Sequence, residues 1–214
     1  MQKLNALLQP KIIRSHETDI LCEQETGGML WVKRQDIKSK GTTQQIDNGD
    51  CHWFFLEEGT VEFQIGSDSY LLQTHDCIFI PGSIASAIAH GNGCAIHGTF
   101  KAGSGHFASD QSLRVMRKSE AQCFEIGSSA AWVFTASQSL WAGIIETPSL
   151  HDPPPATPPH KDKLFLVLAG RYEFQIGDAR VQLETGDAAW APHGTLHQFR
   201  VVSAAPGQVL AIAV

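Results

Sequence analysis

Short apolar or alternating runs, separated by glycines, dominate the hydrophobic pattern of this chain. Eight such runs stand out: residues 53–56, 61–65, 70–72, 78–80, 164–168, 172–176, 181–183 and 188–190. Glycines such as Gly59, Gly66, Gly170 and Gly177 lie at their ends. Runs of this length with turn residues between them are typical of antiparallel strands in a sandwich or barrel. The pattern therefore predicts an all-β protein.

Helical periodicity is weak elsewhere in the chain. Leucines within residues 4–8 predict one short N-terminal helix, and residues 109–122 predict a second. The proline-rich segment 151–159 is unsuited to a central strand because proline donates no hydrogen bond to a neighbouring strand. We expect this segment to be a stiff, extended loop.

The chain repeats itself. The sequence Glu-Phe-Gln-Ile-Gly occurs at residues 62–66 and again at 173–177. At the same constant offset, without gaps, identical residues recur in these pairs: Gly59 and Gly170, Leu72 and Leu183, Thr74 and Thr185, Asp76 and Asp187, Pro81 and Pro192. Matches at turn and core positions indicate a duplicated fold. We expect an N-terminal unit of residues 1–110 and a C-terminal unit of residues 111–214.

The segment from Gly186 to His197 fits the pattern G-x5-P-x-G-x2-H. Together with the preceding strand runs, it resembles the second motif of the cupin superfamily. The resemblance covers both units and implies two cupin-type antiparallel β-barrels in tandem (double-stranded β-helix, jelly-roll-like) with few short helices, that is, a bicupin. Cupins include oxygenases, decarboxylases, isomerases, storage proteins and sensors, so the resemblance predicts the fold and leaves the function open.

In metal-binding cupins, two histidines and a glutamate of a first motif join the second-motif histidine around one divalent metal, Fe, Mn, Ni, Cu or Zn. Counting back from Gly170, Lys163 occupies the glutamate position, and residues 156–159 offer no ordinary ligand at the histidine positions. His197 alone carries over. A rearranged metal site of His151, His160 and His197 remains open.

The first unit departs from the motif differently. His52 occupies the glutamate position, Gln45 and Asp47 occupy the histidine positions, and Ser86 replaces the second-motif histidine. Gln45, Asp47 and His52 are thus a weaker metal candidate, with a hydrogen-bonded polar interior as the alternative. His75 replaces a turn glycine, and we expect it in a left-handed turn.

The candidate lining of the second barrel is aromatic: Phe165, Phe174, Trp190 and Phe199. An apolar pocket with a few polar groups suits a small organic ligand. The sequence does not fix which members of each alternating set face inward.

Composition narrows the function classes. The chain is 43% hydrophobic and 18% charged, with a formal net charge of −6, and it has no apolar run of the ~20 residues that span a bilayer. We therefore expect a cytoplasmic protein that binds neither nucleic acid nor membrane. Its five cysteines lack paired spacing, which favours reduced thiols.

Three functions agree with these features. The first is a bicupin that binds a small organic molecule in a barrel pocket, with a degenerate or absent metal site, as a sensor or accessory protein. The second is a metal-dependent oxygenase or isomerase that uses His197. The third is a mainly structural or assembly protein. The resemblance also implies a homodimer or a pairing of the two barrels.

Overall fold

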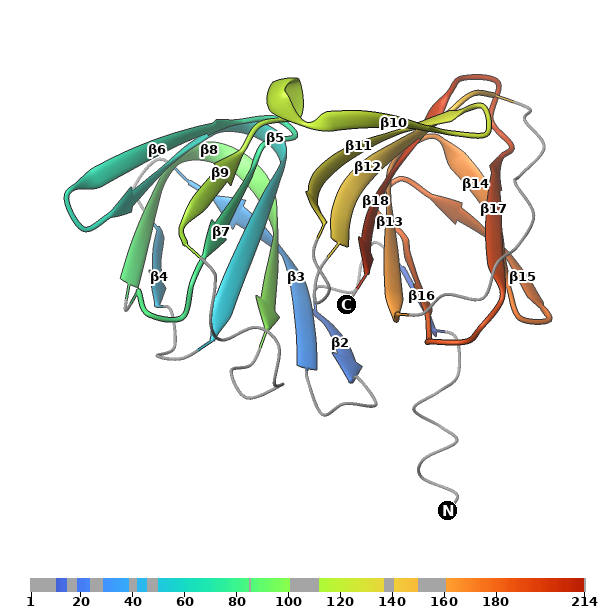
Figure 1. Ribbon diagram of the computed structural model, residues 1–214, viewed down its shortest axis with the longest axis horizontal. Helices are drawn as coiled ribbons and strands as arrows, with labels where there is room; N and C mark the ends of the chain where they lie inside the picture. The colour runs from blue at the N-terminus through green and yellow to red at the C-terminus, as the bar shows by residue number, and fades with distance from the viewer. Residues whose placement is uncertain are drawn as a thin grey trace, which may run out of the picture. The chain divides into compact units, whose positions relative to one another are not determined.

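The computed structural model describes residues 11–14, 19–23, 29–38, 42–45, 50–84, 86–100, 112–136, 141–149 and 161–213. They belong to two compact units (Figure 1). We call residues 18–121 the N-terminal barrel, and residues 1–17 together with 122–214 the C-terminal barrel. Apart from one 3-10 turn, Lys118–Glu120, every described element is a strand, and every described strand pairing is antiparallel.

The described strands of the N-terminal barrel are β2 (Asp19–Glu23), β3 (Met29–Ile37), β4 (Thr42–Gln45), β5 (Cys51–Ile65), β6 (Asp68–Gln73), β7 (Cys77–Ile80), β8 (Ser86–Phe100) and β9 (Arg114–Met116). They form a sheet in the order β2-β3-β8-β5-β7-β9, with β4 on β8 and β6 on β5. The long strands β5 and β8 pair with each other at the centre of this sheet, with β7 beside β5 and β3 beside β8.

The described strands of the C-terminal barrel are β1 (Lys11–Ile13), β10 (Gln122–Ile126), β11 (Ser129–Ala136), β12 (Trp141–Thr147), β13 (Lys163–Ala169), β14 (Arg171–Ile176), β15 (Ala179–Glu184), β16 (Ala188–Ala191), β17 (His197–Val201) and β18 (Gly207–Ala213). Seven form the sheet β1-β16-β13-β18-β12-β11-β10, and three form the sheet β15-β14-β17. Inward side chains of both sheets build one core.

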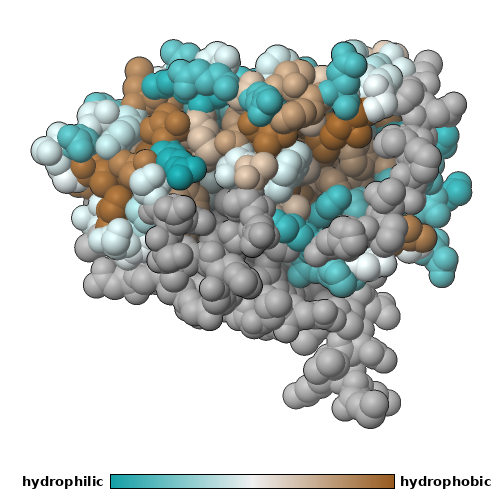
Figure 2. Space-filling view, in the orientation of Figure 1, coloured by the Kyte–Doolittle hydropathy of each residue, from teal (hydrophilic) through white to brown (hydrophobic). Residues whose placement is uncertain are grey.

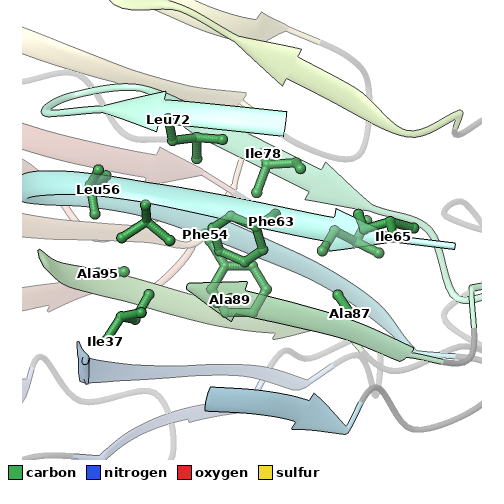
Figure 3. Packing of buried hydrophobic residues seen from close by; sticks show 12 residues of the cluster. Ile37, Phe54, Leu56, Phe63, Ile65, Leu72, Ile78, Ala87, Ala89 and Ala95 are labelled. Carbon is green, nitrogen blue, oxygen red and sulfur yellow. The ribbon is translucent and has the colours of Figure 1, made fainter. Parts of the chain in front are cut away.

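The two cores use the same positions of the repeat. Figure 3 shows the N-terminal core, in which Phe54 and Phe63 lie between aliphatic side chains of neighbouring strands. The buried residues of the two cores match in these pairs: Phe54 and Phe165, Leu56 and Val167, Val61 and Tyr172, Phe63 and Phe174, Ile65 and Ile176, Leu72 and Leu183. The duplication predicted from the sequence is therefore a duplication of the packed interior.

The predicted strand runs are present, but the two barrels join them differently. The runs around Gly170 form two strands, β13 and β14, whereas β5 continues through Gly59 with a register shift between Leu56 and Glu58. Gly59 has a φ of 93°, and a Cβ atom there would collide with the carbonyl oxygen of Asn92 on β8. Only glycine permits this close approach of two backbones. In the C-terminal barrel, Pro206 lies in the break between β17 and β18.

Each barrel is completed by a short edge strand with the same chemistry. β1 pairs with β16, and Arg14 donates to Asp187 at 2.8 Å and to the carbonyl oxygen of Gln182 at 3.1 Å. β9 pairs with β7, and Arg117 contacts Asp76 and the carbonyl oxygen of Leu71, each at 3.2 Å.

These matching edge strands mean that the barrels do not follow the expected boundary at residue 110. β1 precedes the N-terminal barrel in the chain but belongs to the C-terminal one, while β9 extends the N-terminal barrel to residue 121. The leading strand of each repeat therefore completes the barrel of the other repeat. The boundary between the two barrels is set by which strands pair with each other. The composition of the sequence does not reveal this pairing.

Local expectations are partly confirmed. His75 has a φ of 71°, as expected for a residue in place of a turn glycine. The helix expected over residues 109–122 is wrong, because its described part forms β9 and the 3-10 turn. Residues 4–8 and 151–159 lie outside the described part. Among the described cysteines, Cys51, Cys77, Cys94 and Cys123 are all free thiols.

The surface of the described part is mixed in polarity. On the face drawn in Figure 2, hydrophobic and hydrophilic residues are interspersed. Large exposed hydrophobic side chains are few: Leu71, Phe124, Ile126 and Leu196. No helix in the described ranges is long and apolar enough to cross a membrane.

Candidate functional site

His197 begins β17 and lies inside the C-terminal barrel. It pairs with Ile176 of β14, which belongs to the core, and directly paired residues of antiparallel strands share one face. Its side chain is 9% exposed, and its Nδ1 lies 3.1 Å from the carbonyl oxygen of Thr195. Because a carbonyl oxygen only accepts hydrogen bonds, Nδ1 carries the proton, and Nε2 is left with its lone pair.

Hydrogen bonds within the turn and to Asp162 hold the turn before β17 in place. Thr195 donates its backbone N–H to the carbonyl oxygen of Pro192 at 3.0 Å, and Gly194 has a φ of 75°. Asp162 accepts the backbone N–H of His193 at 2.6 Å. The family-type spacing from Pro192 to His197 thus encodes a tight turn that aims the imidazole inward.

One aromatic ring, that of Phe165, lies against this imidazole and belongs to a larger cluster of aromatic rings. The ring centroid of Phe165 lies 5.2 Å from that of His197 and 5.5 Å from that of Phe199. Phe174 and Phe199 are 5.2 Å apart, and Tyr172 lies within 6 Å of both. Phe165, Phe174 and Phe199 thus lie on the inner strand faces, which the sequence left open, and their role as ligand lining stays a prediction.

Trp190, predicted as a fourth lining residue, lies on the other face of its strand. Its neighbours Ala189 and Ala191 on β16 belong to the barrel core, so Trp190 points away from it. It is nevertheless buried, at 2% exposure, and pairs with Leu164 of β13. The strand is buried on both faces, which removes the alternation that would have fixed its register in the sequence.

Lys163 lies inside the same barrel as His197. It begins β13 and shares a strand face with Phe165 and Val167, both core residues. Burial lowers the pKa of Lys163 because the ammonium group loses hydration. Burial also lowers the pKa of His197, and the charge of Lys163 adds to that effect, whereas the contact with Thr195 opposes it. The described site therefore combines one cation, one imidazole and an aromatic wall.

The N-terminal barrel holds a different polar cluster, made of His52, His97 and Thr99. His52 Nδ1 and His97 Nε2 are 2.8 Å apart, and Thr99 Oγ1 lies 3.5 and 3.4 Å from these atoms. His97 also stacks on Phe54, with ring centroids 4.1 Å apart. Burial lowers the pKa of His97 to about 3, and repulsion from His52 and Lys33 contributes. The imidazole of His97 is therefore neutral at neutral pH.

Sequence reasoning missed His97 because no motif spacing connects it with His52. The signal lies in strand alternation: Ala95, His97 and Thr99 share one face of β8, opposite His52 and Phe54 of β5. The other predicted partners of His52 stay untested. Gln45 pairs with Ser86 through its backbone, and Asp47 lies outside the described residues, as do His151 and His160.

A surface hollow of about 110 Å³ lies on the outer side of the C-terminal barrel. Part of its lining, residues 198–200, directly follows His197 in the sequence. Its lining includes Glu173 and Gln175, which alternate with the inward residues of β14. Four of its polar side chains pair with one another: Arg200 with Glu173 at 2.9 Å, and Gln198 with Gln175 at 2.9 Å. Phe199, whose ring also contacts Phe165 and Phe174, is a residue that this hollow shares with the interior site.

The geometry defines a protein of two antiparallel barrels of the jelly-roll type, and comparisons with known proteins show which proteins it resembles. Residues 148–213 match the family model described as Cupin domain. The fold is similar to that of the protein Ylba from E. coli, with 10% sequence identity and a TM-score of 0.74 over 96% of this chain and 90% of that chain.

Two enzymes show a similar fold. Salicylate 1,2-dioxygenase from Pseudaminobacter salicylatoxidans is 11% identical, with a TM-score of 0.70 over 97% of this chain and 84% of that one. Oxalate decarboxylase from Bacillus subtilis, a protein with Mn(II) centres, is 10% identical, with a TM-score of 0.69 over 94% and 76%. No curated protein matches the sequence significantly. Residues 148–213 thus match a cupin domain, and the chain as a whole has the bicupin fold.

The described side chains of the C-terminal barrel do not fit the divalent metal that the fold family implies. Nε2 of His197 is a suitable ligand atom, but its neighbours are Phe165 and Lys163. A lysine at the glutamate position replaces a negative ligand by a positive charge, which repels a cation. Within the described ranges no group of three histidine, cysteine or acidic side chains is close enough to hold a metal.

Proposed function

We propose that this bicupin binds a small organic molecule inside the C-terminal barrel, at the His197 end, and acts as a sensor or accessory protein rather than through a cupin metal centre. The observation that carries the proposal is the buried imidazole of His197. Its Nδ1 proton is held by Thr195, and its ring lies against Phe165. An oriented polar atom beside aromatic rings is the usual composition of a small-molecule site.

The chemistry of the site supports recognition. Nε2 of His197 offers an acceptor to a ligand hydroxyl or amide, and Phe165 and Phe199 offer apolar contact area. The pKa of His197 is below its usual value, so the ring is neutral at neutral pH and keeps this acceptor. Binding therefore requires neither a metal nor a change of protonation.

The alternative is a metal-dependent oxygenase or isomerase. It is motivated by His197 itself, because a histidine whose Nδ1 donates to a carbonyl oxygen presents Nε2 as metal-ligating histidines do. Bacillus subtilis oxalate decarboxylase, which has a similar fold, has Mn(II) centres. This alternative needs His151 and His160 to join His197.

Metal analysis separates the two functions. The purified protein is incubated with Fe(II), Mn(II), Ni(II), Cu(II) or Zn(II) salts, desalted and analysed by native mass spectrometry, beside His197→Ala and the matched variant His52→Ala. We expect no stoichiometric metal that depends on His197. One bound metal per chain that is lost in His197→Ala and retained in His52→Ala would establish the metal-dependent alternative.

A further inference from the structure

Lys163 is the feature of the C-terminal barrel that the proposed function leaves unused. It pairs with Ala191 on one side and with Ala213 on the other, and all three share the inner strand face. At the matching positions of the N-terminal barrel, His52 pairs with Ile80 and Thr99. The stem of Lys163 is therefore flanked by methyl groups, where the other barrel has larger side chains.

The next pair of facing residues on the inner strand faces also has a smaller side chain in the C-terminal barrel. Phe54 faces His97 across β5 and β8, whereas Phe165 faces Ala211 across β13 and β18. Three alanines in the C-terminal barrel thus replace an isoleucine, a histidine and a threonine of the N-terminal barrel. Smaller side chains at matching backbone positions fill less of the barrel interior, and close packing requires other atoms to fill the difference. Trp141, which pairs with Ala213 and packs against the core, forms the adjoining wall.

The charge of Lys163 has no counterpart among the described residues. Burial is the cause that lowers its pKa, and no acidic side chain raises it. Asp162, its neighbour in sequence, accepts a hydrogen bond from the backbone of His193. A partly buried ammonium group without a carboxylate costs free energy, which a bound anion recovers through a charge-assisted hydrogen bond.

From this placement, and resting on the proposed function, we infer that the ligand of the C-terminal barrel is an organic carboxylate. Its carboxylate binds the ammonium group of Lys163, and its apolar body lies against Phe165, Phe199 and Trp141. His197 receives a hydrogen bond from a further polar group of the ligand. The lysine at the glutamate position thereby turns a cation-binding position into an anion-binding one.

Matched ligand pairs test this inference. Benzoate and benzamide, and hexanoate and hexanamide, have similar shapes and differ in charge. Binding is measured by isothermal titration calorimetry with the wild-type protein, Lys163→Met and Lys163→Arg. Lys33→Met, which removes the lysine beside His97 in the other barrel, is the matched control. Melting curves without ligand establish that each variant is folded, and Lys163→Gln replaces Lys163→Met if the latter is unfolded.

We expect the carboxylates to bind at least about tenfold more tightly than their amides, in line with a charge-assisted hydrogen bond. Lys163→Met should lose this preference, while Lys163→Arg and Lys33→Met keep it. Equal binding of carboxylate and amide, or an unchanged preference in Lys163→Met, would overturn the inference but leave small-molecule binding intact. Failure of every carboxylate and every amide to bind at millimolar concentration would count against the proposed function itself.

Discussion

The two barrels have matching hydrophobic cores, but the polar residues beside these cores differ. Phe63 and Phe174 occupy one matching position and are fully buried in both barrels. Beside the core, the N-terminal barrel has a polar cluster of His52, His97 and Thr99, whereas the C-terminal barrel has Lys163 among alanines. Duplication therefore preserved the residues that fill the barrels, while the polar residues beside these cores diverged.

The largest effect should come from the shared core. Phe63→Ala and Phe174→Ala each remove a fully buried ring, which typically costs about 3–5 kcal/mol of unfolding free energy. We expect similar losses for the two variants, measured by urea unfolding. Hydrogen exchange should show lost protection in β5 for the first variant and in β14 for the second. A cost in only one of the two would contradict the equivalence of the cores.

The stability of the N-terminal barrel should decrease at acid pH because this barrel contains the buried His97. The pKa of His97 is about 3 in the folded state and about 6.5 when unfolded, so the unfolded chain binds more protons between these values. Its contribution to stability is therefore complete above pH 6.5 and falls as the pH drops toward 3, by at most about 1.4 kcal/mol per pH unit. Urea unfolding at several pH values measures this slope.

His97→Leu should flatten this dependence, because the buried imidazole is removed. His193→Leu, at an exposed position of the other barrel, serves as the control and should leave it unchanged. A slope that persists in His97→Leu would show that the acid sensitivity arises elsewhere.

A smaller loss of stability should follow when the arginine contacts of the two edge strands, β1 and β9, are removed. Arg14 and Arg117 make matching contacts with Asp187 and Asp76, but both arginines are partly exposed, so each variant to alanine should cost only about 1 kcal/mol. Hydrogen exchange should rise in β16 for Arg14→Ala and in β7 for Arg117→Ala. If Arg14→Ala instead loosened β7, the assignment of β1 to the C-terminal barrel would be wrong.

Much of this comparison could be predicted from the sequence. The repeated strand runs and the G-x5-P-x-G-x2-H spacing correctly predicted two cupin-type barrels, since turn and core positions repeat without gaps. The same alignment placed Lys163 and His52 at one matching position. The inward orientation of Phe165, Phe174 and Phe199 was left open by the sequence and follows from the strand register.

Other features depend on strand pairing and escaped prediction. The partnership of His52 with His97 arises from the register of β5 and β8, and the outward orientation of Trp190 arises on a strand buried on both faces. The location of β1 in the C-terminal barrel is a long-range pairing with no local signal. In each case the deciding contact joins residues far apart in the chain.

The central claim is that one scaffold carries a ligand site in only one of its barrels. Titration of the isotope-labelled protein with benzoate, followed by amide chemical shifts in two-dimensional NMR spectra, tests it most directly. We predict that the shifts change at Lys163, Phe165 and His197 on β13 and β17, and stay constant along β5 and β8. Changes centred on His52 and His97, or equal changes in both barrels, would contradict the account.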